Sequence, residues 1–365
     1  TSSINITPGG SGEVGVYYNL VDSDGNSNWY VANLSIFLGN ITMATDNAVT
    51  ISGLKDTTSY SWKAAIAYKS TGVILALGAT KQFSTIPYVP GQLKVPSQYS
   101  TIQAGLNAAR ESDTVLVEAG TYTENIIWPD VNGIKLISAG DSSNTIIDGG
   151  GISSVIYINP SSATIDTTTI IKGFKITNGS NVKLGGGIFC KNAGIIIDES
   201  VIADNKVIGS GDVDGAGIFV ENSIIKIKNS ILRNNIGDPS ASSHGGGILT
   251  YKSYFIIENV TFRANSSNQG GGAYFMQSSG TVKDAIIENN SSAQLGGGLA
   301  ASTGGPYSDG SISIDYTTIR DNDSGGRDGG AMFQTGKVTL NNSTIMKNSS
   351  GTNGGGLCLD SIKVV

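Results

Sequence analysis

Gly185-Gly186-Gly187-Ile188-Phe189-Cys190 is the stretch that decides the fold, because variants of it return along the second half of the chain. Successive copies are 30, 30, 25, 26, 33 and 25 residues apart. An apolar run follows most copies. Self-similarity with a period of about 20–50 residues is typical of solenoids, propellers and other arrays. The copies are Gly-Gly-Gly, Gly-Ala-Gly or Gly-Gly-Ala triplets that begin at Gly185, Gly215, Gly245, Gly270, Gly296, Gly329 and Gly354.

A second repeated pattern is an apolar residue, two variable residues and then Asn. Between the triplet and this pattern lies a run of alternating apolar residues, such as Ile195 and Ile197. We therefore expect three short strands per repeat and one coil of a parallel β-helix per repeat, with stacked Ile, Val, Leu and Phe inside. The Asn pattern occurs at Ile202…Asn205, Leu232…Asn235, Phe262…Asn265, Ile287…Asn290, Ile319…Asn322 and Ile345…Asn348.

Physical chemistry explains why glycine and asparagine recur in such a coil. Corner residues with positive φ favour Gly and, after it, Asn. Consecutive glycines also let neighbouring backbones approach closely. Stacked Asn side chains can hydrogen-bond along a ladder. The repeats therefore predict an all-β fold, and they say little about chemistry.

Composition supports a folded chain of many short strands. The chain has 365 residues, of which 50 are Gly, and only 14% are charged, against roughly 25% in an average globular protein. Disorder needs low hydrophobicity and high charge, so it is not favoured. The net charge of −6 argues against a nucleic-acid partner. No apolar run reaches the roughly 20 residues of a membrane span.

Residues 1–87 form a first domain in this interpretation, residues 88–92 a linker, and residues 93–365 the β-helix. Short strand-like runs at regular spacing predict a β-sandwich for the first domain. Leu54, Tyr60 and Trp62, followed by Gln82-Phe83-Ser84-Thr85, resemble the fibronectin type III pattern. That resemblance implies a spacer, packing or carbohydrate-adjacent module without catalytic residues. The strand-like runs are Gly15–Leu20, Trp29–Phe37, Ala48–Ile51, Ser59–Tyr68 and Gln82–Thr85.

The segment Tyr99–Tyr122 begins the β-helix. We expect Ser100 to cap a short helix that lays Ile102, Leu106 and Ala109 on the end of the solenoid. Tyr-x-Thr-Ile-Gln, a helix and then Asp-Thr-Val-x-Val resemble the start of right-handed parallel β-helix proteins of the pectate-lyase-like superfamily. Enzymes and non-enzymes share that fold, so the resemblance implies no particular function.

The repeats themselves resemble those of polymorphic outer-membrane adhesins. Their Asn pattern and Gly-Gly-Ala/Gly triplets cover about 190 residues, from Phe174 to Leu359. This resemblance implies a surface-exposed adhesive or structural role without catalysis.

One loop gathers the strongest candidates for catalysis. Asp321, Asp323, Arg327 and Asp328 lie together there, next to Arg320. They could bind a cation or a sugar acid, or form a solvated turn in which the charges neutralise one another. His244 is the only histidine, and the residues around it lack the further carboxylates and base of a β-helix polygalacturonase. Catalytic residues are therefore not assigned, and an enzyme is not favoured.

Two places offer oxygen ligands for calcium. Asp22, Asp24 and Asn26 alternate in a Ca²⁺-like spacing, but the distal Glu of an EF-hand is missing and a polar turn is the alternative. Asp212 and Asp214 lie in the insertion Lys206–Asp214. Function could be grafted on that insertion or on those at Ile236–Ser243 and Ser302–Asp309. No cofactor is required in this interpretation, and calcium remains a candidate.

Cys190 and Cys358 lie about six repeats apart. With coils stacked about 4.8 Å apart, they are roughly 29 Å from each other, too far for a disulfide. They are either buried small hydrophobes or pair between subunits. Glycosylation sequons weakly support an exported glycoprotein. The candidate acceptors are Asn33, Asn40, Asn178, Asn259, Asn265, Asn290, Asn322, Asn342 and Asn348.

The combined expectation is a secreted, cell-surface structural or adhesive protein. The last strand, Asp360–Val365, looks like part of an uncovered coil, which predicts self-association head to tail into a filament or surface layer. A polysaccharide lyase or glycoside hydrolase is the first alternative. A non-catalytic glycan-binding module is the second, with cell-surface glycans as partners.

Overall fold

A computed structural model describes residues 13–22, 27–37, 59–68, 74–77, 80–84 and 88–365, apart from 163, 181, 239, 303, 306, 307, 327, 328, 335, 353, 361 and 365. The chain divides into two compact units, Thr1–Val89 and Pro90–Val365. None of the helices in the described part is long and apolar enough to cross a membrane.

The described strands of the N-terminal unit form one antiparallel sheet. Its order is β2-β1-β3-β4, and β5 pairs with β3. The predicted strand at Ala48–Ile51 lies outside the described residues, and Ile74–Leu77 was not predicted. The fibronectin type III assignment stays a prediction. The bounds are β1 Glu13–Asp22, β2 Ser27–Phe37, β3 Ser59–Tyr68, β4 Ile74–Leu77 and β5 Lys81–Ser84.

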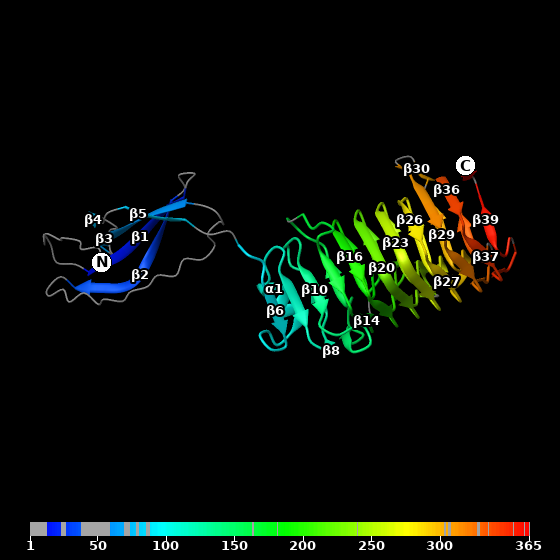
Figure 1. The fold of residues 1–365 in the computed structure, drawn as a ribbon, viewed down its shortest axis with the longest axis horizontal. Coiled ribbons are helices and arrows are strands. Elements are labelled where there is room, and N and C mark those ends of the chain that lie inside the picture. Colours follow the sequence, from blue (N-terminus) through cyan, green and yellow to red (C-terminus); the bar gives the residue numbers. More distant parts are fainter. Residues whose placement is uncertain are drawn as a thin grey trace. The chain divides into compact units, whose positions relative to one another are not determined.

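The C-terminal unit is a right-handed parallel β-solenoid (Figure 1). Its nine-stranded sheet carries one strand per coil, in the order β9, β12, β15, β19, β22, β25, β29, β35 and β39. This confirms the predicted parallel β-helix. The bounds are β9 Ile126–Ile127, β12 Ile156–Ile158, β15 Ile188–Lys191, β19 Ile218–Glu221, β22 Ile248–Tyr251, β25 Ala273–Met276, β29 Leu299–Ser302, β35 Ala331–Phe333 and β39 Leu357–Leu359.

An eighteen-stranded sheet forms the next two sides of each coil. The chain bends between its two sides, and β20 and β23 run through the bend as single long strands. These are the second and third predicted strands of each repeat. The bounds are β6 Gln92–Val95, β7 Thr114–Val117, β8 Gly120–Thr123, β10 Lys135–Ser138, β11 Thr145–Asp148, β13 Ile170–Lys172, β14 Lys175–Thr177, β16 Gly194–Asp198, β17 Val201–Ala203, β20 Ile224–Arg233, β23 Tyr254–Arg263, β26 Ser279–Lys283, β27 Ile286–Glu288, β32 Ser311–Asp315, β33 Thr318–Arg320, β36 Gly336–Asn341, β37 Thr344–Met346 and β40 Ile362–Val364.

A six-stranded sheet adds a fourth side that was not predicted. Its first two strands lie in or beside segments that the sequence analysis treated as insertions. A hairpin of β30 (Gly304–Gly305) and β31 (Ser308–Asp309) interrupts a later coil. The bounds of the six-stranded sheet are β18 Asp212–Asp214, β21 Ser242–His244, β24 Ser266–Gln269, β28 Ser291–Leu295, β34 Asp323–Ser324 and β38 Ser349–Ser350.

Helix α1, Ile102–Ala108, lies at the start of the solenoid (Figure 1). Its N-cap is Thr101, whose side chain accepts a hydrogen bond from the backbone N–H of Ala104 at 3.0 Å, so the prediction of Ser100 was wrong by one residue. Ile102 and Leu106 are fully buried and α1 contacts β6 and β7. The predicted apolar face of the helix therefore covers the first coil.

The Gly triplets are corners for two separate reasons. Gly185 opens its triplet with φ +63°, a conformation that costs other residues strain. Gly247 closes its triplet without that φ, but a Cβ there would lie 2.3 Å from the carbonyl oxygen of Gly272 in the next coil. Both predicted reasons, backbone conformation and close approach, are confirmed.

The repeated Asn residues form a buried ladder. The Nδ2 of Asn235 donates to the carbonyl of Ile202 (3.0 Å) and to Oδ1 of Asn265 (2.9 Å), and that same Oδ1 accepts from the backbone N–H of Asn235 (3.1 Å). The predicted stacking is thus confirmed, but the positive φ belongs to the residue before each ladder Asn. Those residues are Asp204, Asn234, Ala264, Asn289, Asp321 and Lys347.

Stacked apolar side chains fill the interior, as in the Phe255 and Phe275 rings, whose centroids are 4.0 Å apart. Cys190 is buried and free, and burial raises its pKa to about 12, against a smaller lowering effect of Ser223. Cys358 lies on β39, six strands further along the nine-stranded sheet. The predicted separation of six repeats is confirmed, and the two thiols do not pair with each other within the chain.

Candidate functional site

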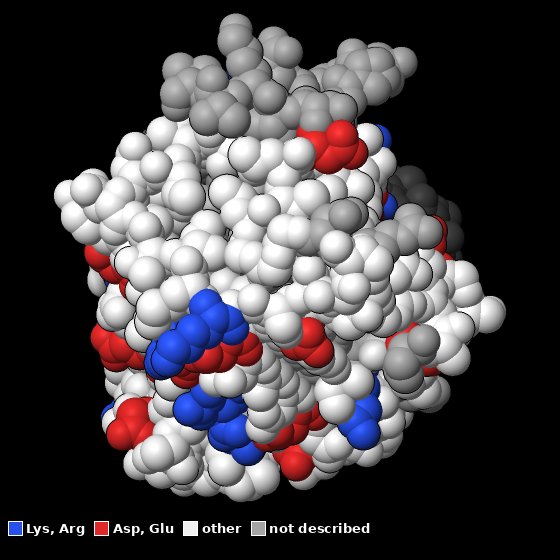
Figure 2. Space-filling view, turned by 90° about the vertical axis from the view of Figure 1, so that its right-hand side faces the viewer, with Lys and Arg blue, Asp and Glu red and all other residues white. Residues whose placement is uncertain are grey.

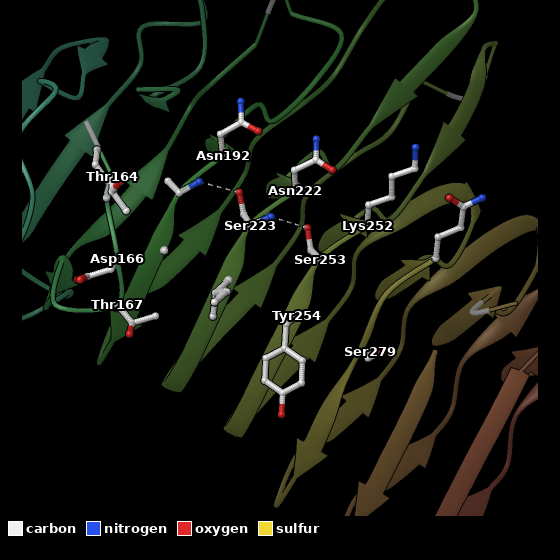
Figure 3. A pocket seen from close by; sticks show the side chains of 15 residues that line it. Thr164, Asp166, Thr167, Asn192, Asn222, Ser223, Lys252, Ser253, Tyr254 and Ser279 are labelled. Atoms are coloured by element: carbon white, nitrogen blue, oxygen red, sulfur yellow. Dashed lines mark hydrogen bonds between the residues drawn. The ribbon is translucent and has the colours of Figure 1, made fainter. Parts of the chain in front are cut away.

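A groove of about 840 Å³ crosses successive coils where the nine-stranded sheet turns into the eighteen-stranded sheet (Figure 3). Four of the five segments that line it occupy equivalent positions in successive coils. The fifth, Thr164–Thr167, comes from the long connection before β13. The other four are 192–194, 222–224, 252–254 and the region of Gln277 and Ser279.

One row of the groove consists of Asn192, Asn222, Lys252 and Gln277. Their φ values lie between +48° and +55°, so the same corner conformation positions all four side chains. The residues that precede them pair in register from coil to coil. Figure 3 shows the amides of Asn192 and Asn222 and the ammonium group of Lys252 extending toward the same side. The row presents three amides and one cation.

The floor of the groove is apolar and solvent-accessible. Ile224 and Tyr254 are partners in register and are 49% and 46% exposed. Beneath them, the hydroxyl of Ser223 accepts from the backbone N–H of Ala193, and that of Ser253 from the backbone N–H of Ser223, both at 3.1 Å (Figure 3). This buried serine ladder fixes the corner below the exposed side chains.

The segment Thr164–Thr167 closes one end of the groove. The Asp166 carboxylate accepts from the backbone N–H of Thr168 at 2.8 Å and from its hydroxyl at 2.5 Å, and these bonds lower the pKa of Asp166. A Cβ on Gly194 would lie 2.8 Å from the carbonyl carbon of Asp166. Gly194 therefore lets this end wall rest directly on the first strand of the groove floor.

This arrangement suits a ligand that is rich in hydroxyl groups. Amide side chains can both donate and accept hydrogen bonds, and an exposed Tyr offers a flat apolar face with a polar tip. Among the described lining residues only Asp166 carries a carboxylate, whereas glycoside hydrolysis ordinarily uses two. The groove has the composition of a binding site more than that of a hydrolytic one.

The predicted charged loop lies elsewhere, and those of its charges that the structure describes have partners within the chain. Arg320 pairs with Glu288 and, at 3.5 Å, with Asp321. The carboxylate of Asp323 accepts from the hydroxyl of Ser349. The two alternatives for this loop, a ligand site and a solvated turn, both stay predictions. The other two candidates, Arg327 and Asp328, lie outside the described residues.

The side chains of Asp214 and His244 are hydrogen-bonded to each other near the predicted calcium position. Their Oδ1 and Nδ1 atoms are 2.7 Å apart, and the His244 ring lies 5.4 Å from that of Tyr274. Burial, and to a lesser extent the charge of Asp214, raises the pKa of Tyr274. The Asp214 carboxylate is thus already bonded to His244. Asp212 lies two residues before Asp214 on β18.

Calcium at either predicted position remains a prediction. In the described part of the chain, no group of three His, Cys, Asp or Glu residues is arranged to hold a metal. Asp22 ends β1, while Asp24 and Asn26 lie outside the described residues.

The sequons fall into different environments. Asn265, Asn290 and Asn322 belong to the buried ladder, so a glycan has no access to their amides in the folded chain. Asn178, Asn259 and Asn342 are exposed and Asn348 is half-buried, and they remain predicted acceptors. Asn33 lies in β2, but the structure does not describe its side chain. Asn40 lies outside the described residues.

The fold defines the chain as a right-handed parallel β-solenoid protein. Comparison with known proteins goes no further, since no family model, curated protein or solved structure matches the chain. The inference of function therefore rests on the groove. Its row was missed in the sequence, although a signal exists: Asn192, Asn222, Lys252 and Gln277 each follow the last Gly of their triplet by five residues.

Proposed function

We propose that this protein is an adhesive β-solenoid of a cell surface, which binds an extended carbohydrate chain in the groove. The observation that carries the proposal is the 46%-exposed Tyr254 on the groove floor, beside the row of corner amides. Calcium-dependent binding and filament formation are not needed for this function.

The repeat of the fold gives the groove a periodic ligand surface. Coils are stacked about 4.8 Å apart, so one polar corner side chain recurs at nearly constant steps. A polymer of linked sugars also presents hydroxyl groups at regular steps. Asn192, Asn222 and Gln277 can bond successive hydroxyls while Tyr254 and Ile224 pack against the apolar faces of the sugar rings.

The groove is also held in shape before a ligand arrives. The serine ladder at Ser223 and Ser253 fixes its floor, and Gly194 supports the end wall. Preformed sites lose little conformational entropy on binding, which favours useful affinity from a modest number of contacts. The extracellular setting itself rests on the resemblance of the repeats to those of outer-membrane adhesins.

The test is binding to a panel of soluble polysaccharides and to a glycan array, followed by calorimetry of the best ligand. Tyr254→Ala should weaken binding about tenfold, because a loss of about 1.4 kcal/mol is tenfold in affinity. Tyr316→Ala is the matched control, since Tyr316 is 59% exposed but lies at a different corner. Wild-type protein that binds no carbohydrate, or equal losses in the two variants, would contradict the proposal.

A further inference from the structure

A column of alternating charge runs along the outer side of the eighteen-stranded sheet. Neighbouring strands bring each residue of the column into register with one of opposite sign. The column lies four residues further along the strands than the groove floor, a distance of about 13 Å. Its members, one per coil, are Lys172, Asp198, Lys228, Glu258, Lys283 and Asp315.

Ion pairs within the chain involve some members of this column and not others. Asp198 is 5% exposed and lies 3.6 Å from the ammonium of Lys172 and 3.1 Å from that of Lys228, with a further bond from Asn229 at 3.0 Å. Glu258 takes part in none of the ion pairs found among the described residues. The middle of the column therefore holds a half-buried carboxylate without an ionic partner in the part of the chain that the structure describes.

When the column is followed in the opposite direction along the solenoid, each position carries the opposite charge. The column is therefore complementary to a second, antiparallel copy of itself. Consider a two-fold axis that is parallel to the strands and passes between β20 and β23. It places Lys172 of one copy opposite Asp315 of the other, and Asp198 opposite Lys283. It also places Lys228 of each copy opposite Glu258 of the other copy, so this contact occurs twice. A two-fold interface needs this property, because the same patch faces itself.

The neighbouring column fits the same axis. Lys226 faces Ile256, and the aliphatic stem of a lysine can cover an apolar side chain. Ile196 faces Thr281, and all four side chains are half-buried. At the bend, Glu199 and Asp284 would face each other, but each has a lysine of its own chain, Lys172 at 2.9 Å and Lys283 at 3.8 Å.

Figure 2 turns one end of the view in Figure 1 toward the reader. It shows basic and acidic side chains next to one another over the lower part of that face, without a large area of either sign. The alternating signs of the charge column itself suit an ordered, self-matching contact better than attraction to a polyanion or polycation.

We propose that a second copy of this chain docks on the charge column with its solenoid axis antiparallel. The contact is distinct from the carbohydrate groove and does not depend on the function proposed for it. Because exposed ion pairs are individually weak and are screened by salt, the dimer is expected to be reversible and to dissociate at high ionic strength.

Sedimentation velocity over a concentration series tests the proposal. Wild type should dimerise at about 0.01 M salt, where the Debye length is about 30 Å, and be monomeric at about 1 M, where it is about 3 Å. Lys228→Glu and Glu258→Lys should each be monomeric, because each places like charges across the axis twice.

An equimolar mixture of Lys228→Glu and Glu258→Lys gives the decisive measurement. In the mixed pair both central contacts again join opposite charges, so dimers should return at low salt. Each variant chain keeps its own internal defect, which mixing cannot repair. Recovery on mixing is therefore specific to contact between chains.

Arg263→Glu is the matched control, because it makes the same change in charge on β23 beyond the bend, and its dimer should persist. Circular dichroism checks that each variant is folded. If a charge reversal unfolds the chain, Glu258→Gln removes the central charge without repulsion and should still weaken the dimer. Wild type that stays monomeric at low salt, or a mixture that stays monomeric, overturns the proposal.

Discussion

At the scale of single residues, the amide of Asn265 has a larger structural role than its small side chain suggests. Its Oδ1 accepts from the backbone N–H and from the Nδ2 of Asn235, and its own Nδ2 donates to the carbonyl of Leu232 and to Asn290. Asn265→Ala removes these bonds in a site with no exposed surface. Unsatisfied buried groups cost about 1–3 kcal/mol each, so we expect a loss of about 3 kcal/mol in the free energy of unfolding.

Urea unfolding measured by circular dichroism checks this value. Asn159→Ala is the control, since Asn159 is exposed and makes one long bond, 3.3 Å to the Tyr157 hydroxyl. A loss at position 265 as small as that at position 159 would show that the ladder contributes little.

The sequence reveals the ladder residues but not their backbone conformation. A spaced Asn was expected to be a corner residue with positive φ, and Asn234 has that conformation while Asn235 does not. Asn235 instead turns its amide into the stack. The two properties of Asn, tolerance of positive φ and a side chain that donates and accepts, predict the same residue type at both positions. Only the coil geometry separates them.

At the scale of the strand, the charge column couples stability to pH through Asp198. Burial raises the pKa of this carboxyl group, but bonds from Asn229 and Lys228 and the charges of Lys228 and Lys172 outweigh burial, so the pKa is lowered overall. A depressed pKa stabilises the folded state above the unfolded value, near 3.9 for Asp. This stability is lost as the pH falls through the folded pKa.

Asp198→Asn should therefore be less stable than wild type at neutral pH, by about 2 kcal/mol for a lost charged hydrogen-bond group. The difference should shrink as the pH falls below about 4. Urea unfolding of both proteins across this pH range measures it, and the other titrating carboxylates cancel because both proteins share them. A difference that stays constant from neutral pH into acid would contradict the assigned role.

The elements were predictable to the extent that they bury apolar residues. Ile195 and Ile197 mark β16 by their alternation, and both are fully buried. Strand β24, Ser266–Gln269, contains only polar residues, so alternation does not reveal it. It forms because β21 and β28 align beside it once the coils are stacked. A strand that forms only because its neighbours align beside it cannot be recognised from its own sequence.

At the scale of the whole molecule, the same reasoning separates fold from site. The period of the triplets predicts the solenoid, since each repeat can bury its apolar face only against the next. The groove needs more: Tyr254 must lie beside Ile224, and Asp166, from a distant connection, must lie on Gly194. Those neighbours depend on the register and on the path of a connection without a repeat. Residues from different coils can be assigned to one site only after stacking is known.

Stability in such an array is expected to be a sum over coils and their interfaces, so damage should remain local. Phe262 is 1% exposed and lies in the interior of β23. Phe262→Ala should cost about 3–5 kcal/mol, because the cavity cannot fill without moving neighbouring strands.

Hydrogen exchange followed by mass spectrometry locates that loss. Amides of β23 and of β20 and β27, which both pair with β23, should exchange faster, whereas those of β7 and β10 should keep the wild-type rate. Thr261→Ala, which removes the half-buried outward neighbour on the same strand, should change little. Faster exchange along the whole solenoid would mean instead that it opens as one cooperative unit, in which case single coils could not adapt their corner residues to a ligand independently.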